Sequence, residues 1–121
     1  LARSFSLFAR ASALGHAEAG NCAGLMLEAG EGVRADAARA RDAYAAAAAR
    51  GSSAAAYNLG TLYEKQGCLG TALQAFRRSD ELGHVSAPRD VWRVRALLDE
   101  STVLDHSRVL DQSSRLDDVP E

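Results

Sequence analysis

Apolar side chains recur through most of the chain with the spacing of helices. Leu59, Leu62 and Tyr63 stand at positions i, i+3 and i+4, which lie on one face of a helix, and Ala72 and Phe76 share that spacing. Alanine, the best helix former, is abundant, whereas the β-branched and aromatic residues that favour strands are scarce. The pattern therefore predicts an all-α fold.

An aromatic residue followed seven positions later by a glycine occurs three times, at intervals of 36 and 32 residues. The three pairs are Phe8 and Gly15, Tyr44 and Gly51, and Phe76 and Gly83. A period of this length is typical of proteins in which each repeat is a pair of helices. The glycine follows the second helix of a pair, where a residue with positive φ commonly ends a helix.

The repeat predicts helices of two alternating types, with a serine at position 52 or 53 as one helix cap. We call the first helix of each pair A-type and the second B-type. The B-type helices are expected at 4–14, 37–50 and 69–82, and the A-type helices at 17–29, 53–66 and 86–98. Gly60 of the second A-type helix is expected to admit a closely packed neighbour.

The resemblance to a known family is carried by the middle of the chain. It rests on the motif Gly30-x-Gly32-Val33-x-x-Asp36, then Ala40, Tyr44, Ala47-Ala48 and Gly51, then Ala55 and Asn58-Leu59-Gly60-x-x-Tyr63, which resembles a Sel1-like repeat. The next stretch, with Gly67, Ala72 and Phe76, resembles the related tetratricopeptide repeat. The resemblance covers residues 5 to about 90. It implies a short right-handed α-α superhelix, or solenoid, of helix-turn-helix repeats.

The two ends of the repeat region depart from this pattern. In the third repeat Trp92 replaces the glycine and Arg95 replaces the aromatic residue, so we expect a terminal repeat in which Trp92 covers the end of the stack. Residues 1–17 carry arginines and no acid, as organelle transit peptides do. Because Phe8 and Gly15 match the repeat, an ordered B-type helix is favoured there over a transit peptide.

The resemblance also implies a binding surface, the concave face lined by A-type helices. Its predicted partner-binding residues are Asn21, Glu28, Tyr57, Thr61, Glu64, Arg89 and Arg93. Tyrosine and arginine are the residue types enriched at binding hot spots. Some tetratricopeptide proteins bind a terminal carboxylate on this face. Only Asn58 matches that pattern, because Leu25, Ser86 and Asp90 replace the required polar or basic residues, so this activity is not expected.

The C-terminal segment differs in charge from the rest of the chain. Residues 1–98, the predicted repeat domain, carry 12 basic and 9 acidic side chains, a net charge of +3. Residues 99–121 carry two basic and seven acidic side chains, a net charge of −5, and their apolar residues form no helical stripe. We predict a docking tail that buries Val103, Leu104, Val109, Leu110 and Leu116 against the repeat body or a partner.

Several classes of function are disfavoured. The net charge of −2 gives no basic surface for nucleic acid, and the longest apolar run is too short for a transmembrane segment. No phosphate loop, dinucleotide motif or nucleophile elbow occurs, and the two cysteines, Cys22 and Cys68, and His16, His84 and His106 lack metal-ligand spacing. We therefore expect no catalytic residue, metal or cofactor. His16 and His84, each directly after a helix-ending glycine, are expected to be packing or capping residues of turns.

The most favoured function is protein–protein interaction, as a structural or scaffolding subunit of a multi-subunit complex. One alternative is a free regulatory or chaperone adaptor that binds a peptide in the concave groove. A second is a hydrolase, because some Sel1-like proteins are linked to antibiotic hydrolysis. Those chains are rich in cysteine and this one is not, which disfavours that alternative. The compartment stays open between the cytoplasm and an organelle interior such as the mitochondrion.

Overall fold

A computed structural model describes residues 2–100, which form six helices and, within that range, no strand. The helices are α1 (Ala2–Ala13), α2 (Ala17–Ala29), α3 (Ala37–Ala49), α4 (Ser53–Lys65), α5 (Leu69–Glu81) and a sixth helix at residues 87–100. The predicted helices are confirmed: the bounds of α1 to α5 lie within two residues of the expected positions, and the sixth helix begins one residue after its expected start.

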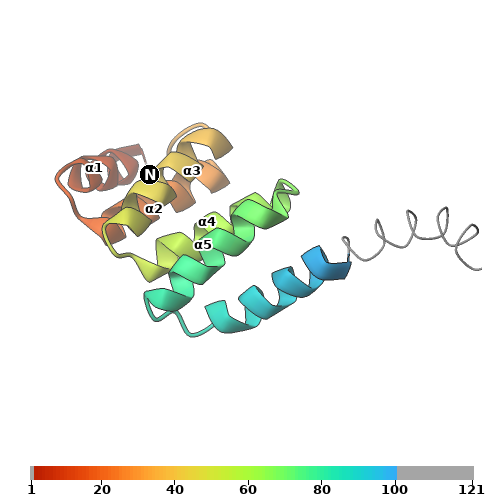
Figure 1. Cartoon of the computed structure of the whole chain (residues 1–121). Helices are drawn as coiled ribbons and strands as arrows, with labels where there is room; N and C mark the ends of the chain where they lie inside the picture. Colours follow the sequence, from red (N-terminus) through yellow and green to blue (C-terminus); the bar gives the residue numbers. More distant parts are fainter. Residues whose placement is uncertain (1, 101–121) are drawn as a thin grey trace, which may run out of the picture.

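The helices form a short solenoid in which each helix packs against the next along the chain (Figure 1). Helices α2 and α4 also touch each other, and α4 is hydrogen-bonded to the sixth helix. The three A-type helices therefore lie side by side, and we call the surface that they form the A-helix face. Figure 1 places α1 at one end of the stack and the sixth helix at the other.

The turns after the B-type helices follow the repeat. Gly15, Gly51 and Gly83 all have positive φ values, between 93° and 100°, as the aromatic-to-glycine spacing predicts. Ser52 caps α4, because its hydroxyl accepts a hydrogen bond from the backbone N–H of Ala55 at 3.1 Å. The same turn therefore redirects the chain after each B-type helix.

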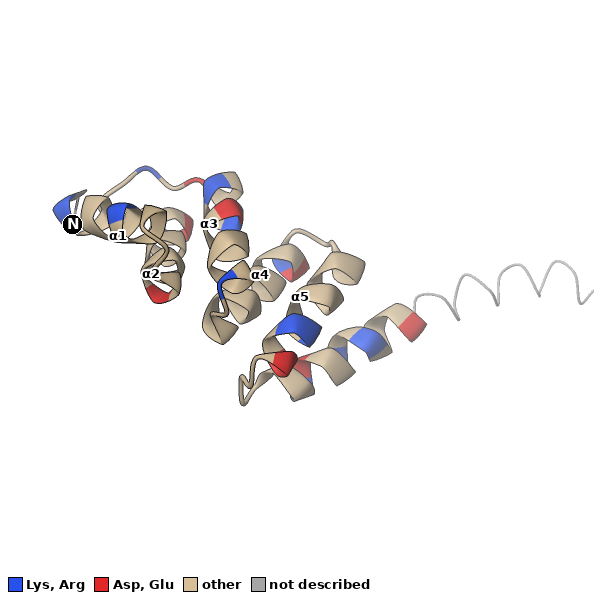
Figure 2. Ribbon diagram, turned by 60° about the vertical axis from the view of Figure 1, so that its left-hand side comes forward, with Lys and Arg blue, Asp and Glu red and all other residues tan. Residues whose placement is uncertain are grey.

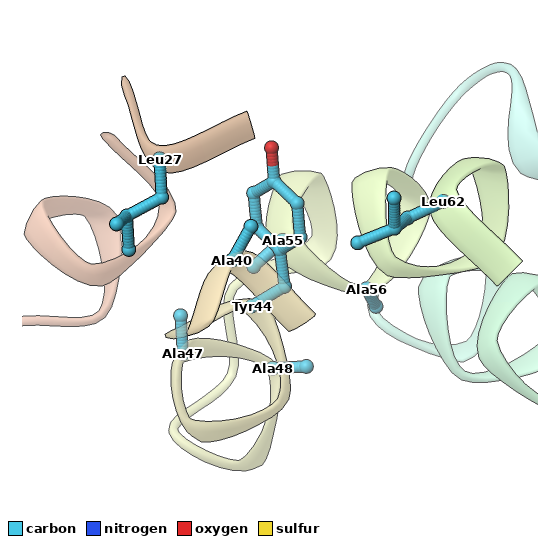
Figure 3. Close-up of a cluster of buried hydrophobic side chains, with 8 residues drawn as sticks. All are labelled: Leu27, Ala40, Tyr44, Ala47, Ala48, Ala55, Ala56 and Leu62. Carbon is cyan, nitrogen blue, oxygen red and sulfur yellow. The ribbon is translucent and has the colours of Figure 1, made fainter. Parts of the chain in front are cut away.

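The core is centred on one aromatic ring in each helix pair. Tyr44 of α3 is fully buried and lies against Gly24 of α2, where an added Cβ would come within 2.5 Å of the ring. It belongs to a cluster built largely of alanines, shown in Figure 3: Leu27, Ala40, Tyr44, Ala47, Ala48, Ala55, Ala56 and Leu62. Small side chains allow the helices to pack closely around the ring.

The second ring, Phe76 of α5, repeats this contact on Gly60 of α4. A Cβ on Gly60 would come within 2.8 Å of the Phe76 ring, which confirms the prediction that Gly60 is a packing residue. Ala72 and Val94 complete the buried cluster around Phe76. Val94 joins the sixth helix to this core.

The prediction that Trp92 covers the end of the stack is wrong. Trp92 is 70% exposed, and the guanidinium of Arg95 lies 5.9 Å from the centre of its ring. The helical period explains the error, because Val94 and Ala87 share the buried face of the sixth helix and Trp92 stands on another face. Most of the Trp92 side chain is therefore left exposed by residues 2–100.

None of the helices within residues 2–100 is both long and apolar enough to span a bilayer.

Candidate protein-binding face

The A-helix face contains a groove between α2 and α4, with a volume of about 400 Å³. Its lining combines apolar, amide, hydroxyl and charged side chains: Leu25, Glu28, Ala29, Asn58, Thr61 and Lys65. We call it the α2/α4 groove. Its residues stand one helical turn apart on each helix, so the repeat itself brings them together.

Glu28 links three helices at one edge of this groove. Its carboxylate accepts a hydrogen bond from the Tyr44 hydroxyl at 2.7 Å and another from the Lys65 ammonium at 3.0 Å. Burial raises the pKa of Tyr44 well above its usual value, and the neighbouring Glu28 carboxylate raises it further. The tyrosine is therefore a neutral donor that fixes the position of Glu28.

A second polar contact joins α2 and α4 through Asn58, one of the residues that line the groove. The side-chain amide nitrogen of Asn58 donates to the side-chain oxygen Oδ1 of Asn21 at 2.8 Å, and Asn21 is buried. The Thr61 hydroxyl donates to the backbone carbonyl of Tyr57 at 3.1 Å. Asn21, which the repeat pattern predicted as a partner contact, thus links two helices of its own chain.

The other end of the A-helix face is occupied by an ionic cluster around Asp90. We call it the Asp90 cluster; its members are Tyr57, Glu64, Arg89, Asp90 and Arg93. The Tyr57 hydroxyl donates to Asp90 at 2.5 Å, and Arg93 donates to the other carboxylate oxygen from Nε at 3.2 Å and from Nη2 at 3.0 Å. Arg93 also donates to both carboxylate oxygens of Glu64, so the cluster joins α4 to the sixth helix.

The charges in the Asp90 cluster stabilise one another. Burial alone would raise the pKa of Asp90, but hydrogen bonds from Tyr57 and Arg93 outweigh it and hold that pKa below its usual value. The hydrogen bond from Arg93 likewise lowers the pKa of Glu64. The hydrogen bond to Asp90, with burial, raises the pKa of Tyr57. At neutral pH the cluster therefore holds two carboxylates and one neutral phenol.

The two histidines that follow helix-ending glycines, His16 and His84, differ in their contacts. The His84 ring stacks on Tyr57, with ring centres 4.3 Å apart, and its Nδ1 accepts a hydrogen bond from the Ser86 N–H at 3.2 Å. The packing role predicted for His84 is confirmed. His16 stands at the N-cap of α2 without a side-chain capping bond, and it is exposed.

The seven predicted contact residues fall into three groups. Tyr57, Glu64, Arg89 and Arg93 lie in the Asp90 cluster, and Glu28 and Thr61 line the α2/α4 groove. Asn21 is buried and hydrogen-bonded to Asn58. Their role in binding a partner stays a prediction. The remaining groove residues could have been found from the sequence, because the repeat places Leu25, Ala29 and Lys65 on the same face.

Asp90 is the central residue that the sequence analysis missed. Its position was considered only for carboxylate binding, for which an acidic residue is unsuitable. The spacing Asp90-x-x-Arg93 was an available signal, because residues i and i+3 are neighbours on a helix. The predicted tail contacts, from Val103 to Leu116, lie outside the described residues. Within residues 2–100, no group of histidine, cysteine or acidic side chains could hold a metal ion.

The architecture is that of a short α-solenoid built from paired helices. It is a Sel1-like repeat fold: the crystal structure of a Sel1 repeat protein from Oxalobacter formigenes is similar to it, with a TM-score of 0.66 and 27% sequence identity over 72% of this chain. The chain spans 37% of that protein's length. Comparison by sequence finds no matching family model and no matching curated protein.

Proposed function

We propose that this chain is a protein–protein interaction module that binds a segment of another protein in the α2/α4 groove. The observation that carries the proposal is an open groove on the A-helix face whose lining is both apolar and polar. Likeness to a Sel1 repeat fold supports a binding role, because α-solenoids expose an extended surface of this kind.

The chemistry of the α2/α4 groove favours a mixed peptide segment. Leu25 and Ala29 offer apolar contact, while Asn58 and Thr61 carry hydrogen-bonding groups suited to a peptide backbone. Lys65 is paired with Glu28, so the groove carries no strong net charge. We therefore expect recognition through one apolar side chain and backbone hydrogen bonds, and not through charge alone.

The Asp90 cluster is assigned a structural role in this proposal. Its carboxylates already accept hydrogen bonds from Tyr57 and Arg93, so a partner would have to displace existing charge-assisted bonds. Arg89 is the exception, because its side chain is 76% exposed. By the same criterion Glu28, which already accepts hydrogen bonds from Tyr44 and Lys65, is assigned a structural role. Of the predicted contacts, Thr61 and Arg89 are thus the ones we retain for direct binding.

A fixed place in a larger complex is the finer part of the proposal. It is supported by exposed apolar side chains away from the groove: Leu7, Leu14, Val85 and Trp92. The alternative is a freely acting adaptor. Size-exclusion chromatography of a native extract distinguishes the two, because a subunit elutes with its complex and an adaptor elutes largely alone.

The proposal for the groove is tested by affinity purification with quantitative mass spectrometry. Leu25→Arg places a charge in the groove, and Gln74→Arg places the same charge on an exposed position of α5. We expect Leu25→Arg to lower recovery of groove-bound proteins at least about tenfold, as loss of a hot spot does. Gln74→Arg should leave recovery unchanged. Equal recovery with both variants, at equal helicity by circular dichroism, would refute groove binding.

The acidic segment 99–121 is proposed as a docking tail, on the basis of its net charge and its five apolar residues. Amide exchange of the isolated chain tests this. Fast exchange there that slows in the complex supports docking on a partner. Slow exchange in the isolated chain would indicate docking on its own body, and fast exchange in both states would refute docking.

A further inference from the structure

A second groove, with a volume of about 260 Å³, lies between the B-type helices α1 and α3, and residues of α2 form its base. We call it the α1/α3 groove. Its apolar lining includes Phe5, Ala9, Leu27 and Ala43, and its charged lining is Arg39 and Asp42. Leu27 is buried, whereas both charged residues are exposed. The groove thus combines an apolar base with a charged rim, and all three helices around it lie within residues 2–100.

An arginine stands at each end of the α1/α3 groove. The guanidinium of Arg39 lies 5.8 Å from the centre of the Phe5 ring. Arg50, directly after α3, donates from Nη1 to the backbone carbonyl of Ser12 at 3.1 Å, and Ser12 also lines the groove. The two arginines are eleven positions apart, about 16 Å along a helix. Among residues 2–100 neither forms an ion pair, so both charges are available to a ligand.

The repeat itself does not require a base at either position. With the core rings of α3 and α5 aligned, the counterpart of Arg39 is Thr71. The counterpart of Arg50 is Leu82, which packs against the alanine-rich core cluster. The two arginines are therefore a property of this groove and are not needed for helix pairing.

Charge is unevenly distributed between the helices around this groove. Helices α1 and α3 together carry four arginines and one acidic residue, whereas α2 and α4 carry three acidic residues and one lysine (Figure 2). Asp42, the acid that lines the groove, lies 4.0 Å from Nε of Arg41, which offsets its charge. The α1/α3 groove therefore attracts an acidic segment more strongly than the A-helix face does.

An acidic segment of this chain has the matching pattern. Residues 116–121 are Leu-Asp-Asp-Val-Pro-Glu, with three acids and no base. In an extended backbone alternate side chains share a face, so Asp117, Val119 and Glu121 form an acidic, apolar, acidic series. The two acids are then about 13 Å apart, a distance that the long arginine side chains can match. Pro120 favours this extended backbone, because it restricts its own φ and the conformation of the residue before it.

The segment is long enough to reach the groove of its own molecule. Hydrogen bonds from α4 to Asn21 and Glu28 of α2 each join residues 37 positions apart, so these helices run parallel, and the sixth helix runs in the same direction (Figure 1). The sixth helix therefore ends at the edge of the stack where α2 ends and α3 begins. With neighbouring helices about 8–10 Å apart, the groove lies roughly 30 Å from that end. Residues 101–116 can span about 50 Å.

We propose that this acidic segment binds in the α1/α3 groove of the same molecule. Asp117 pairs with Arg39, at the edge from which the segment arrives. Glu121 pairs with Arg50, and Val119 lies on the apolar base between the two pairs. This inference rests on the docking tail of the proposed function and adds the surface to which that tail binds. It does not depend on peptide binding in the α2/α4 groove.

NMR relaxation of the ¹⁵N-labelled 121-residue chain tests the proposal through the order parameter of the Val119 amide. In the parent chain we expect a value above about 0.6, the limit below which a backbone is flexible. Arg39→Glu with Arg50→Glu replaces attraction by repulsion, so the value should fall below that limit. Arg77→Glu with Arg78→Glu, at two exposed positions of α5, makes the same change of charge and should leave the value unchanged. Circular dichroism checks that both variants keep the helicity of the parent.

The decisive sample exchanges the charges. Asp117→Arg with Glu121→Arg should release the segment when made alone, because two arginines then face two arginines. Combined with Arg39→Glu and Arg50→Glu, the same changes should restore the order parameter of Val119. General loss of stability or of net charge would not be reversed in this way.

A Val119 amide that is flexible in the isolated parent chain would overturn the proposal. Slower amide exchange of segment 99–121 in a complex would then still support the docking tail of the proposed function, and fast exchange in both states would refute that tail as well. Order that persists in Arg39→Glu with Arg50→Glu would place the segment elsewhere, and an equal loss in the α5 control would assign its order to general charge. Order lost on dilution would assign the contact to a second copy. Each of these three results would also overturn the proposal.

Discussion

The helix pairs α2/α3 and α4/α5 contain the same apolar contact but different polar links to the neighbouring A-type helix. In both, an aromatic ring lies on a glycine at a distance that no larger residue could allow. In the first pair the Tyr44 hydroxyl itself reaches Glu28, which binds Lys65. In the second, Phe76 has no hydroxyl, and Tyr57 packs against its ring with a centroid distance of 5.3 Å.

The comparison shows that the repeat constrains the ring-on-glycine contact but allows the polar link to vary. The ring-on-glycine contact sets the distance between two helices, so it tolerates no change of size. The polar link needs only a phenol, a carboxylate and a cation within reach of the next A-type helix. In the first pair the phenol comes from the B-type helix, and in the second from the A-type helix. Packing is thus more constrained than the polar groups around it.

The largest effect is expected from breaking the ring-on-glycine contact. Gly60→Leu should lower the free energy of unfolding by about 1–3 kcal/mol, because the new side chain must displace the Phe76 ring. Gly70→Leu is the matched control, since a Cβ at Gly70 meets no atom within 4 Å. Chemical denaturation followed by circular dichroism measures both. Equal stability of the two variants would contradict the role of Gly60.

A somewhat smaller effect is expected from removing the centre of the polar link. Asp90→Ala leaves the Tyr57 hydroxyl without its acceptor and removes one of two partners of Arg93. We expect a loss of about 1–2 kcal/mol, because a nearly buried hydrogen-bonded charge is involved but Tyr57 retains some access to water. Arg77→Ala, at an exposed position of α5, is the control. A loss no greater than the control's would show that the cluster does not stabilise the stack.

The contribution of Asp90 should also depend on pH. The folded-state pKa values of Asp90 and Glu64 lie below the usual ones, so ionisation favours the folded state and this stabilisation is lost as pH falls through those lowered values. Protonated aspartic acid resembles asparagine. The difference in Tm between the parent and Asp90→Asn should therefore be largest near neutral pH and shrink below about pH 4. A constant difference would exclude ionisation as its cause.

The fold could be predicted almost completely from the sequence, whereas the binding face could be predicted only in outline. Helices, glycine turns and the packing role of Gly60 all depend on local spacing, which the sequence contains directly. The roles of Asn21 and Tyr57 depend on the neighbouring helix, because each side chain is engaged by a residue more than thirty positions away. The position of a residue within a repeat does not show whether its side chain contacts another helix of the same chain or a second protein.

The position of Trp92 illustrates the same limit. The repeat pattern correctly makes Trp92 equivalent to Gly24 and Gly60. In the preceding repeats, however, this position faces the B-type helix that follows, and it does not cover the end of the core. The surroundings of Trp92 depend on the element that packs against it, and its position in the repeat does not identify that element.

The smallest effect is expected at the polar link of the first pair. The Lys65 ammonium lies 3.0 Å from Glu28, but the Lys65 side chain is 64% exposed, so water and salt screen the attraction. Lys65→Gln should change the free energy of unfolding by less than about 1 kcal/mol, and the change should fall further in high salt. Glu28 would still accept the hydrogen bond from Tyr44, which keeps it in place. Denaturation at low and high salt measures this difference. A loss as large as that of Asp90→Ala would mean that the two polar links are equivalent and that exposure does not decide their strength.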